Sequence, residues 1–458
     1  MNTNRNYRFL CCSLFTSILV TGVLSSITLH ANDWPEWRGA GRQAVWTDDG
    51  VVDRFPSGGL KVTWRTPIQA GFSGPVVADG RVFVTDFAFL PETKVMDGTE
   101  RILALDEQTG EVLWTHDWPA AYRNLQLSYA TGPRATPTVD GDRVYVAGAA
   151  GMLLCLETST GRVVWSHDAV AEYDTTIPVW GVASAPLVEE DLVIYIAGGE
   201  PDALVMAFDK RTGAEVWRSI NVVGEMGYGQ PVIYEAGGVR QLIVWHPTAV
   251  SSLNPETGDV YWEEPWEVPG AMTVTTPVRS ENYLFFTQFY GGSMMLRLDT
   301  DRPAATALWK VAGSSEMPDG SAALHSLITT PIVKDDYIYG VGSYGELRGL
   351  DAATGDRLWV SDQMTAQRRW GAAFMVQHGD RYFVNNDAGD LILAQFTPEG
   401  YVELDRTKLI EATSRAGYGP RRFEDRAVNW THPAYANRHI ITRNDNEIIR
   451  VSLDVNDY

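Results

Sequence analysis

One phrase recurs five times in this chain: an Asp-like residue, two others, Thr, Gly, and a Trp four positions after the Gly. The copies occupy residues 106–114, 157–165, 209–217, 254–262 and 351–359. Their Trp residues recur about every 50 positions, and a decayed copy ending at Trp309 divides the one long interval. Such a period indicates one supersecondary unit repeated around or along an axis, and this constrains the fold more than composition does.

Each unit has the pattern of four antiparallel strands. A small residue, Pro and a short apolar run open the unit, as at residues 73–77, and a turn leads to an alternating strand such as 82–84. A third strand ends at the Asp-like residue, and the Thr-Gly turn leads to a fourth strand that carries the Trp. β-Branched and aromatic residues at period two are typical of strands, and Gly supplies the positive φ of a short hairpin.

Eight such units follow one another, and the last is incomplete. One opening, at residues 374–375, is degenerate. The other seven openings contain Pro, at Pro75, Pro137, Pro186, Pro231, Pro277, Pro331 and Pro433. The last unit ends after a third strand at residues 450–454, while an orphan strand at 61–64 precedes the first unit. Closing a ring removes an exposed sheet edge. We therefore predict an all-β, eight-bladed β-propeller whose last blade is closed by the N-terminal strand.

The repeated phrase resembles the tryptophan-docking repeat of the quinoprotein (pyrroloquinoline quinone, PQQ) propeller superfamily over about residues 33–458. Residues 33–39, Asp-Trp-Pro-Glu-Trp-Arg-Gly, also resemble the start of mature PQQ-repeat proteins of bacterial envelopes. Within the superfamily the chain is most similar to the outer membrane protein assembly factor B group. WD40 and kelch repeats are disfavoured, because neither a Gly-His…Trp-Asp pairing nor a double-Gly signature recurs.

The resemblance implies that the fourth-strand tryptophans wedge between neighbouring blades. A large aromatic side chain buries on the order of 200 Å², which is worth a few kcal/mol at about 25 cal/mol per Å². We interpret these residues as structural, with Leu404 in the corresponding place of the seventh unit. They are Trp64, Trp114, Trp165, Trp217, Trp262, Trp309 and Trp359.

The start of the chain has the pattern of a secretory signal. Arg5 and Arg8 form a basic segment, residues 10–27 are mostly apolar, and Ala31 ends a cleavage-site pattern. We expect cleavage there, with a retained membrane anchor as the alternative. The product would be exported to the periplasm or the extracellular space. No other stretch is long and apolar enough to span a bilayer.

This divides the chain into a signal peptide over residues 1–31, an N-terminal arm over 32–60 and a propeller over 61–458. The formal net charge of −21 disfavours nucleic acid and anionic lipid as partners, because both repel an acidic protein. We expect a monomer with an envelope or secreted protein as partner. Cys155 is the only cysteine beyond the signal, so we expect no intrachain disulfide in the mature chain.

The superfamily also contains PQQ-dependent alcohol and sugar dehydrogenases, whose cofactor lies on the propeller axis with Ca²⁺ and a carboxylate base. In the alcohol enzymes a disulfide between adjacent cysteines packs against the quinone. Here the only adjacent pair, Cys11 and Cys12, lies in the predicted signal, and no segment aligns with the calcium-binding and base residues. No other catalytic or metal-ligand motif is present. We expect no catalytic residue, metal or cofactor; PQQ with Ca²⁺ is the alternative.

In this architecture the residues just before each unit's opening line the axial funnel. Aromatic and polar side chains there can stack on and hydrogen-bond a sugar, a quinone or a peptide, and Arg suits a carboxylate. Mutual pairing around a wet channel is the structural alternative. The candidates are Arg134, Trp180, Tyr228, His325, Arg369, Trp370, Asn429 and Trp430. The sequence thus predicts a non-catalytic binding scaffold of the envelope, with a PQQ-dependent dehydrogenase or a glycan-binding propeller as alternatives.

Overall fold

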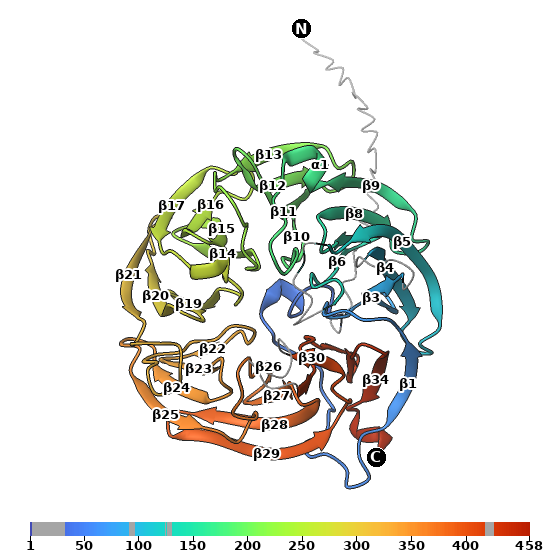
Figure 1. Cartoon of the computed structure of the whole chain (residues 1–458), viewed down its shortest axis with the longest axis vertical. Helices are drawn as coiled ribbons and strands as arrows, with labels where there is room; N and C mark the ends of the chain where they lie inside the picture. Colours follow the sequence, from blue (N-terminus) through green and yellow to red (C-terminus); the bar gives the residue numbers. More distant parts are fainter. Residues whose placement is uncertain (2–32, 91–96, 124, 126–130, 417–425) are drawn as a thin grey trace.

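The computed structural model describes residues 33–90, 97–123, 125, 131–416 and 426–458, together with Met1. The predicted signal peptide, apart from Met1, lies outside the described residues. Within the described part of the chain, eight four-stranded antiparallel sheets are arranged around one axis (Figure 1). This confirms the predicted all-β, eight-bladed propeller.

The first four blades, each given from its inner to its outer strand, follow the chain order. Blade 1 comprises β2 (Val76–Ala78), β3 (Arg81–Phe89), β4 (Asp97–Asp106) and β5 (Val112–Ala121), and blade 2 comprises β6 (Thr138–Asp140), β7 (Arg143–Ala147), β8 (Met152–Glu157) and β9 (Val163–Asp168). Blade 3 comprises β10 (Leu187–Glu189), β11 (Leu192–Gly199), β12 (Ala203–Asp209) and β13 (Glu215–Ser219), and blade 4 comprises β14 (Val232–Ala236), β15 (Val239–His246), β16 (Ala249–Leu253) and β17 (Val260–Pro265).

The other four blades continue around the ring. Blade 5 comprises β18 (Val278–Ser280), β19 (Tyr283–Gln288), β20 (Gly292–Leu298) and β21 (Ala305–Val311), and blade 6 comprises β22 (Ile332–Lys334), β23 (Tyr337–Val341), β24 (Leu347–Asp351) and β25 (Arg357–Ser361). Blade 7 comprises β26 (Ala373–His378), β27 (Arg381–Asn386), β28 (Asp390–Thr397) and β29 (Gly400–Lys408), and blade 8 comprises β32 (Ala434–Ala436), β33 (His439–Arg443), β34 (Glu447–Ser452) and β1 (Val62–Pro67). A hairpin of β30 (Ser414–Ala416) and β31 (Arg426–Val428) precedes blade 8, and the short helix α1 (Ala169–Tyr173) follows β9.

The predicted ring closure is confirmed by the pairing of β1 with β34. The two strands run antiparallel, with Trp64 opposite Arg450 and Thr66 opposite Ile448. The N-terminal strand therefore becomes the outer strand of the blade that ends the chain, and Figure 1 shows blue β1 beside red β34. Pairing of the two ends leaves no gap between the first blade and the last.

The hydrophobic core lies between adjacent blades. The middle strands are buried on both faces, as in β7 and β8, because each blade packs face to face against its two neighbours. Cys155 of β8 is fully buried in the cluster between blades 2 and 3, and burial raises the pKa of its thiol to about 12. The outer strands, such as β5, alternate between covered and exposed residues, since one face meets solvent.

The repeat tryptophans dock each blade onto the next. The Trp114 indole N–H donates to the Thr158 carbonyl of blade 2 at 2.9 Å. An added Cβ on Gly161, whose φ is +69°, would lie 2.4 Å from that indole. Gly is thus required at this position of the phrase for two reasons. Its φ is positive, and the indole ring approaches too closely for a Cβ atom. Trp64, Trp165, Trp217, Trp309 and Trp359 likewise donate to backbone carbonyls of the following blade.

Trp262 is the exception among the seven. Its indole donates to Gln241 Oε1 in its own blade, at 2.8 Å. The following copy, at residues 299–309, has lost the Gly and carries Pro303 in the turn. The decay of one repeat therefore coincides with a changed partner for the tryptophan of the blade before it.

The N-terminal arm lies across the axis of the ring, where the short 3₁₀ segment η1 (Ala40–Arg42) is seen in blue at the centre of Figure 1. The buried Arg42 guanidinium donates to the carbonyls of Pro231 and Pro186 at 2.9 and 2.6 Å and pairs with Glu36 at 3.0 Å. Trp34 pairs with Val77 through backbone hydrogen bonds. The arm thus ties together the starts of several inner strands.

No helix of the described residues is long and apolar enough to cross a membrane.

Candidate ligand pocket on the propeller axis

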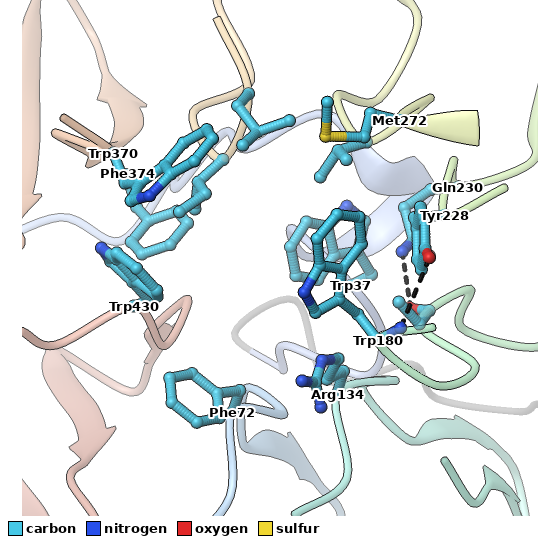
Figure 2. A pocket seen from close by; sticks show the side chains of 14 residues that line it. Trp37, Phe72, Arg134, Trp180, Tyr228, Gln230, Met272, Trp370, Phe374 and Trp430 are labelled. Atoms are coloured by element: carbon cyan, nitrogen blue, oxygen red, sulfur yellow. Dashed lines mark hydrogen bonds between the residues drawn. The ribbon is translucent and has the colours of Figure 1, made fainter. Parts of the chain in front are cut away.

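A pocket of about 200 Å³ lies where the eight blades meet (Figure 2). Every blade contributes to it from the segment that leads into its inner strand or from the start of that strand, and the arm contributes one ring. The lining residues are Trp37, Phe72, Arg134, Trp180, Ala183, Tyr228, Gln230, Met272, Val274, Leu327, Ile328, Trp370, Phe374 and Trp430. They converge because each incoming segment crosses from the outer strand of one blade to the axial strand of the next.

Trp37 closes one side of the pocket from the arm. Its indole N–H donates to Thr276 Oγ1 at 3.0 Å, and its ring lies 4.9 Å from the imidazole of His432. His432 is buried and also lies 5.2 Å from the Phe374 ring. Burial and the nearby Arg38 lower the pKa of His432 to about 3, so its imidazole is neutral at physiological pH.

Two polar lining residues hold the wall in place. Gln230 donates to the Ala183 carbonyl at 2.9 Å and accepts from the Ala185 N–H at 2.7 Å. The Tyr228 hydroxyl donates to Glu225 at 3.2 Å, and its ring lies 5.6 Å from that of Trp180. Burial raises the pKa of Tyr228. Both side chains are therefore engaged in positioning neighbouring segments.

Arg134 is the only charged side chain among the described lining residues. Its guanidinium carbon lies 6.0 Å from the centre of the Phe72 ring, and one N–H donates to the Gly132 carbonyl at 3.2 Å. Burial lowers the pKa of Arg134, and the electrostatic interactions with Tyr122, Tyr228 and Glu100 partly offset this by raising it. The pocket thus combines an apolar and aromatic wall with one cation.

Trp370 is held in a strained backbone conformation. Its φ of +65° lies in the left-handed region, which is unfavourable for a bulky residue and costs about 1–3 kcal/mol. Its N–H donates to the Ser343 carbonyl at 2.5 Å, and the Arg369 guanidinium lies 4.4 Å from its ring centre. The strain is maintained by surrounding contacts and places the indole against the pocket.

The structure brings five of the eight candidate residues into the pocket and leaves three outside its lining. Arg134, Trp180, Tyr228, Trp370 and Trp430 line it. The fully buried His325 donates from Nδ1 to the Phe289 carbonyl at 2.8 Å, and burial lowers its pKa. Asn429 accepts from the Thr431 N–H in its own loop at 3.3 Å, and Arg369 packs over Phe289 and Trp370.

Several lining residues were missed by the sequence analysis. Phe72, Gln230, Phe374, Leu327 and Ile328 lie within five residues of an opening, so a wider window around each opening would have included them. Trp37 had no such signal, because nothing in the repeat places the arm on the axis.

The lining does not fit the PQQ and Ca²⁺ pair of the dehydrogenases. Ca²⁺ takes six to eight oxygen ligands, several of them carboxylates, and none of the described lining residues is Asp, Glu or His. Nor do the described residues contain a cluster of three or more His, Cys, Asp or Glu side chains that could hold a metal. Arg134 and the aromatic rings suit a planar anion that binds without a metal ion.

A Ser-His-Glu grouping lies in blade 4, and sequence motifs gave no sign of it. His246 Nε2 lies 2.9 Å from Ser251 Oγ, which donates to Glu263 at 3.0 Å. The carboxylate therefore bonds the hydroxyl, whereas a hydrolytic triad requires it to orient the imidazole. His246 and Ser251 are buried and do not line the pocket. Burial lowers the pKa of His246 to about 4. The grouping is a hydrogen-bond network that runs from buried His246 and Ser251 to the exposed residue Glu263.

Fold and pocket together define a tryptophan-docked propeller of the PQQ-like repeat class. The family model described as outer membrane protein assembly factor BamB matches residues 40–131 and 98–361, well over half of the chain. The chain belongs to this family.

Two kinds of relative are found. BamB of Shewanella oneidensis is 24% identical over 340 residues, which cover 64% of this chain and 79% of that protein. Quinohemoprotein alcohol dehydrogenase ADH IIB of Pseudomonas putida is 29% identical over 170 residues, which cover 36% of this chain and only 21% of that enzyme.

Solved structures of both kinds share the fold. BamB from Moraxella catarrhalis superimposes with a TM-score of 0.55 at 13% identity, covering 86% of this chain and 99% of that one. Quinohemoprotein alcohol dehydrogenase from Comamonas testosteroni gives a TM-score of 0.57 at 14% identity, covering 92% and 81%. At these identities the likeness concerns architecture alone.

Proposed function

We propose that this protein is an exported, non-catalytic binding scaffold of the cell envelope, and that its axial pocket holds a ligand. The observation that carries the proposal is the composition of that pocket. Apolar and aromatic side chains from seven blades and from the arm converge with one Arg from the remaining blade, and no carboxylate or imidazole is found among the described lining residues. Ligand sites are typically apolar concavities with a few polar groups.

The same composition argues against dehydrogenase chemistry. Oxidation of an alcohol requires a group that removes a proton, and a useful base has a pKa near the working pH. Arg134 remains protonated in proteins under ordinary conditions, and the Tyr228 phenol has a raised pKa. The lining thus offers binding and desolvation without an evident base.

A glycan is also a poor match to this lining. Sugar hydroxyls need several donors and acceptors when they leave water, because an unpaired buried polar group is costly. Tyr228 and Gln230 are already bonded to neighbouring segments. The aromatic rings favour a flat, weakly hydrogen-bonding ligand.

The envelope location is supported by membership of the BamB family and by the secretory pattern at residues 1–31. The acidic surface favours a protein partner over nucleic acid. We propose that the partner is an envelope protein, that the scaffold is a monomer, and that the ligand pocket lies at the centre of the ring. Osmotic-shock fractionation of the producing cells tests the location, since a cytoplasmic product contradicts it.

The decisive experiment on catalysis adds PQQ and Ca²⁺ to the purified protein. Gel filtration followed by absorbance measures retained quinone, and dye reduction with alcohols and aldoses measures turnover. We expect neither Ca²⁺-dependent retention nor turnover. A stoichiometric chromophore with turnover would overturn the non-catalytic proposal.

Native mass spectrometry tests whether the pocket is occupied in the cell. Protein isolated from the periplasm without denaturant should carry a small adduct. Val274→Trp fills the pocket and should abolish the adduct, whereas the matched Val260→Trp on the exposed face of β17 should retain it. An adduct that survives Val274→Trp, or bare protein throughout, contradicts the proposed site.

A further inference from the structure

We infer that the N-terminal arm carries a second binding site, in which Arg38 holds a small free oxyanion of the carboxylate type. Arg38 does not line the axial pocket, so this site is separate from the proposed ligand pocket. Three observations carry the inference: the burial of this cation, the few hydrogen bonds that it makes, and the use of the same nitrogens by other arginines of the chain.

Arg38 and Arg42 are two buried cations on the same short arm, and their partners differ. Arg42 donates from Nε to Glu36 at 3.0 Å and from its terminal nitrogens to the carbonyls of Pro231 and Pro186. Arg38 is only 6% exposed, and its one hydrogen bond to the described residues runs from Nη1 to the Arg42 carbonyl at 3.3 Å. The arm therefore satisfies one guanidinium and leaves most donors of the other without a protein partner.

No carboxylate of the described residues forms an ion pair with Arg38. Glu36 of the same arm is engaged through both oxygens, because it accepts from Arg42 Nε and from the Gly41 N–H at 2.9 Å. Burial lowers the pKa of Arg38 to about 10, and the electrostatic interaction with Tyr234 partly offsets this. The guanidinium is thus charged at neutral pH, and a buried charge without a counter-ion is costly.

The two remaining nitrogens, Nε and Nη2, form one edge of the Arg38 guanidinium. They have no hydrogen-bond partner among the described residues and are not fully enclosed, so a small solvent-connected space adjoins them. Elsewhere in the chain this edge binds a carboxylate through both oxygens. Arg101 donates from Nε and Nη2 to Asp86 at 2.7 and 2.6 Å, and Arg240 donates to Glu189 at 2.5 and 2.6 Å.

This comparison identifies the chemistry of the ligand. The planar fork of a guanidinium matches two oxygens of one oxyanion, which makes the pair specific as well as strong. Water would satisfy the N–H groups of Arg38 but would leave its charge unbalanced. The burial of the side chain limits the ligand to a compact anion, since a peptide or a large organic acid does not reach so enclosed an edge.

The backbone around Arg38 shows that the site depends on the docked arm. The φ of Arg38 is +60°, a conformation that a bulky residue keeps only when its surroundings hold it. The Ala44 N–H donates to the Arg38 carbonyl at 2.8 Å, and the preceding residue, Trp37, is bonded to Thr276 of the ring. An anion that binds only this arrangement should stabilise the folded chain.

The test measures the melting temperature of the purified protein in sodium formate and in sodium gluconate at equal sodium concentration. Gluconate carries the same charge but is too large for a buried edge. We expect formate to raise the melting temperature by roughly 1–2 °C for each tenfold increase above its Kd. Formamide, which has a similar size and no charge, should give no such rise.

Three variants assign the effect to one residue. Arg38→Met should lose the rise in formate, and Arg38→Lys should keep a smaller one, because the charge returns without the planar fork. Arg302→Met is the matched control, since it removes an exposed arginine that pairs with Asp299, and it should keep the rise in full. A crystal structure of the unmodified protein in formate should show the anion on Nε and Nη2 of Arg38, and this decides the matter even if Arg38→Met does not fold.

The outcomes separate this inference from the proposed function. An equal rise in Arg38→Met and in the unmodified protein, or only water on the Arg38 edge in the crystal, would overturn the anion site. Formate in the crystal without a rise in melting temperature would mean binding at crystal concentration only, which also overturns it. The adduct experiment with Val274→Trp concerns other residues and decides on the ligand pocket independently.

Discussion

At the rim of the ring, Trp114 and Trp165 occupy equivalent positions and make equivalent contacts. At the axis, Trp180 and Trp430 lie at different positions, six and three residues before the Pro of their openings, and make different contacts. Both rim indoles donate to a backbone carbonyl of the next blade. At the axis, the Trp180 ring packs against Tyr228, and the Trp430 N–H meets no acceptor among the described residues. These two rim tryptophans therefore make the same contact, whereas the two axial tryptophans make different contacts.

This difference shows that one part of each repeat docks the blades together and another part lines the axial cavity. Each blade must dock onto the next in the same way for the ring to close, so the docking residues recur with their Gly and carbonyl partners. The segments that reach the axis carry no such requirement, because they meet a cavity. Irregularity among the segments that lead to the axis therefore points to the ligand site, and Trp370, with its strained backbone, lies there too.

The largest expected effect comes from removing the closing strand. Deleting residues 33–67 removes the arm and β1, which leaves the outer edge of β34 unpaired. We expect insoluble or readily proteolysed protein, as judged by limited proteolysis and gel filtration. Trp37→Ala alters the pocket but keeps β1, so it should remain folded. A monomeric deletion variant with an unchanged melting temperature would contradict the closure.

The next largest effect isolates the docking of an indole on the repeat Gly. Gly161→Ala should cost about 2–5 kcal/mol of unfolding free energy, from the strain of a positive φ and the clash with Trp114. Gly141→Ala in the same blade has a φ of +56° and open space, so it should cost about 1–2 kcal/mol. Urea unfolding measures both, and equal losses would show that strain alone explains the Gly.

The fold could be predicted from the sequence because docking leaves a local signature. Asp106 accepts from the N–H groups of Gln108 and Thr109 within its own turn, which explains the Asp and Thr of the phrase. The orphan strand with Trp64 then required closure. These contacts lie within a few residues or at one fixed repeat spacing, so periodicity reveals them.

The pocket could be predicted only in part. The openings identified Arg134, Trp180 and Trp370, because topology alone brings every opening to the axis. Side-chain direction was not available from the sequence, so His325 was expected in the funnel although it points into a buried bond with Phe289. The position of Trp37 depends on the whole arm, and the Arg42 contacts that hold the arm join residues far apart in the sequence.

A pH change should disturb the axis through His432. The folded-state pKa of about 3 lies below the ordinary value of 6.5, so the unfolded chain takes up a proton first as pH falls. Stability is therefore lost between about pH 6.5 and 3, by up to about 1.4 kcal/mol per pH unit for one imidazole. His246, with a pKa of about 4, contributes in the same direction.

The measurement is the unfolding free energy between pH 7 and 5. His432→Asn keeps a donor for the Pro433 carbonyl and should flatten the slope, leaving the share that belongs to His246 and to the other imidazoles whose pKa burial lowers, such as His325 and His439. The double variant should flatten it further. A slope unchanged in both variants would show that other groups govern the acid response.

The smallest effect compares one tryptophan from each region. Trp165→Phe removes the indole N–H that donates to the Lys210 carbonyl at 3.1 Å. It should cost about 1 kcal/mol beyond the loss of ring size, because that carbonyl keeps the Tyr145 hydroxyl as a donor at 3.0 Å. Trp430→Phe removes an N–H with no acceptor among the described residues, so its cost should lie at least about 1 kcal/mol lower. Thermal and urea unfolding measure both. Equal losses of stability would mean that the axial indole is as structural as the rim indole, and the division of duties between the two regions would then fail.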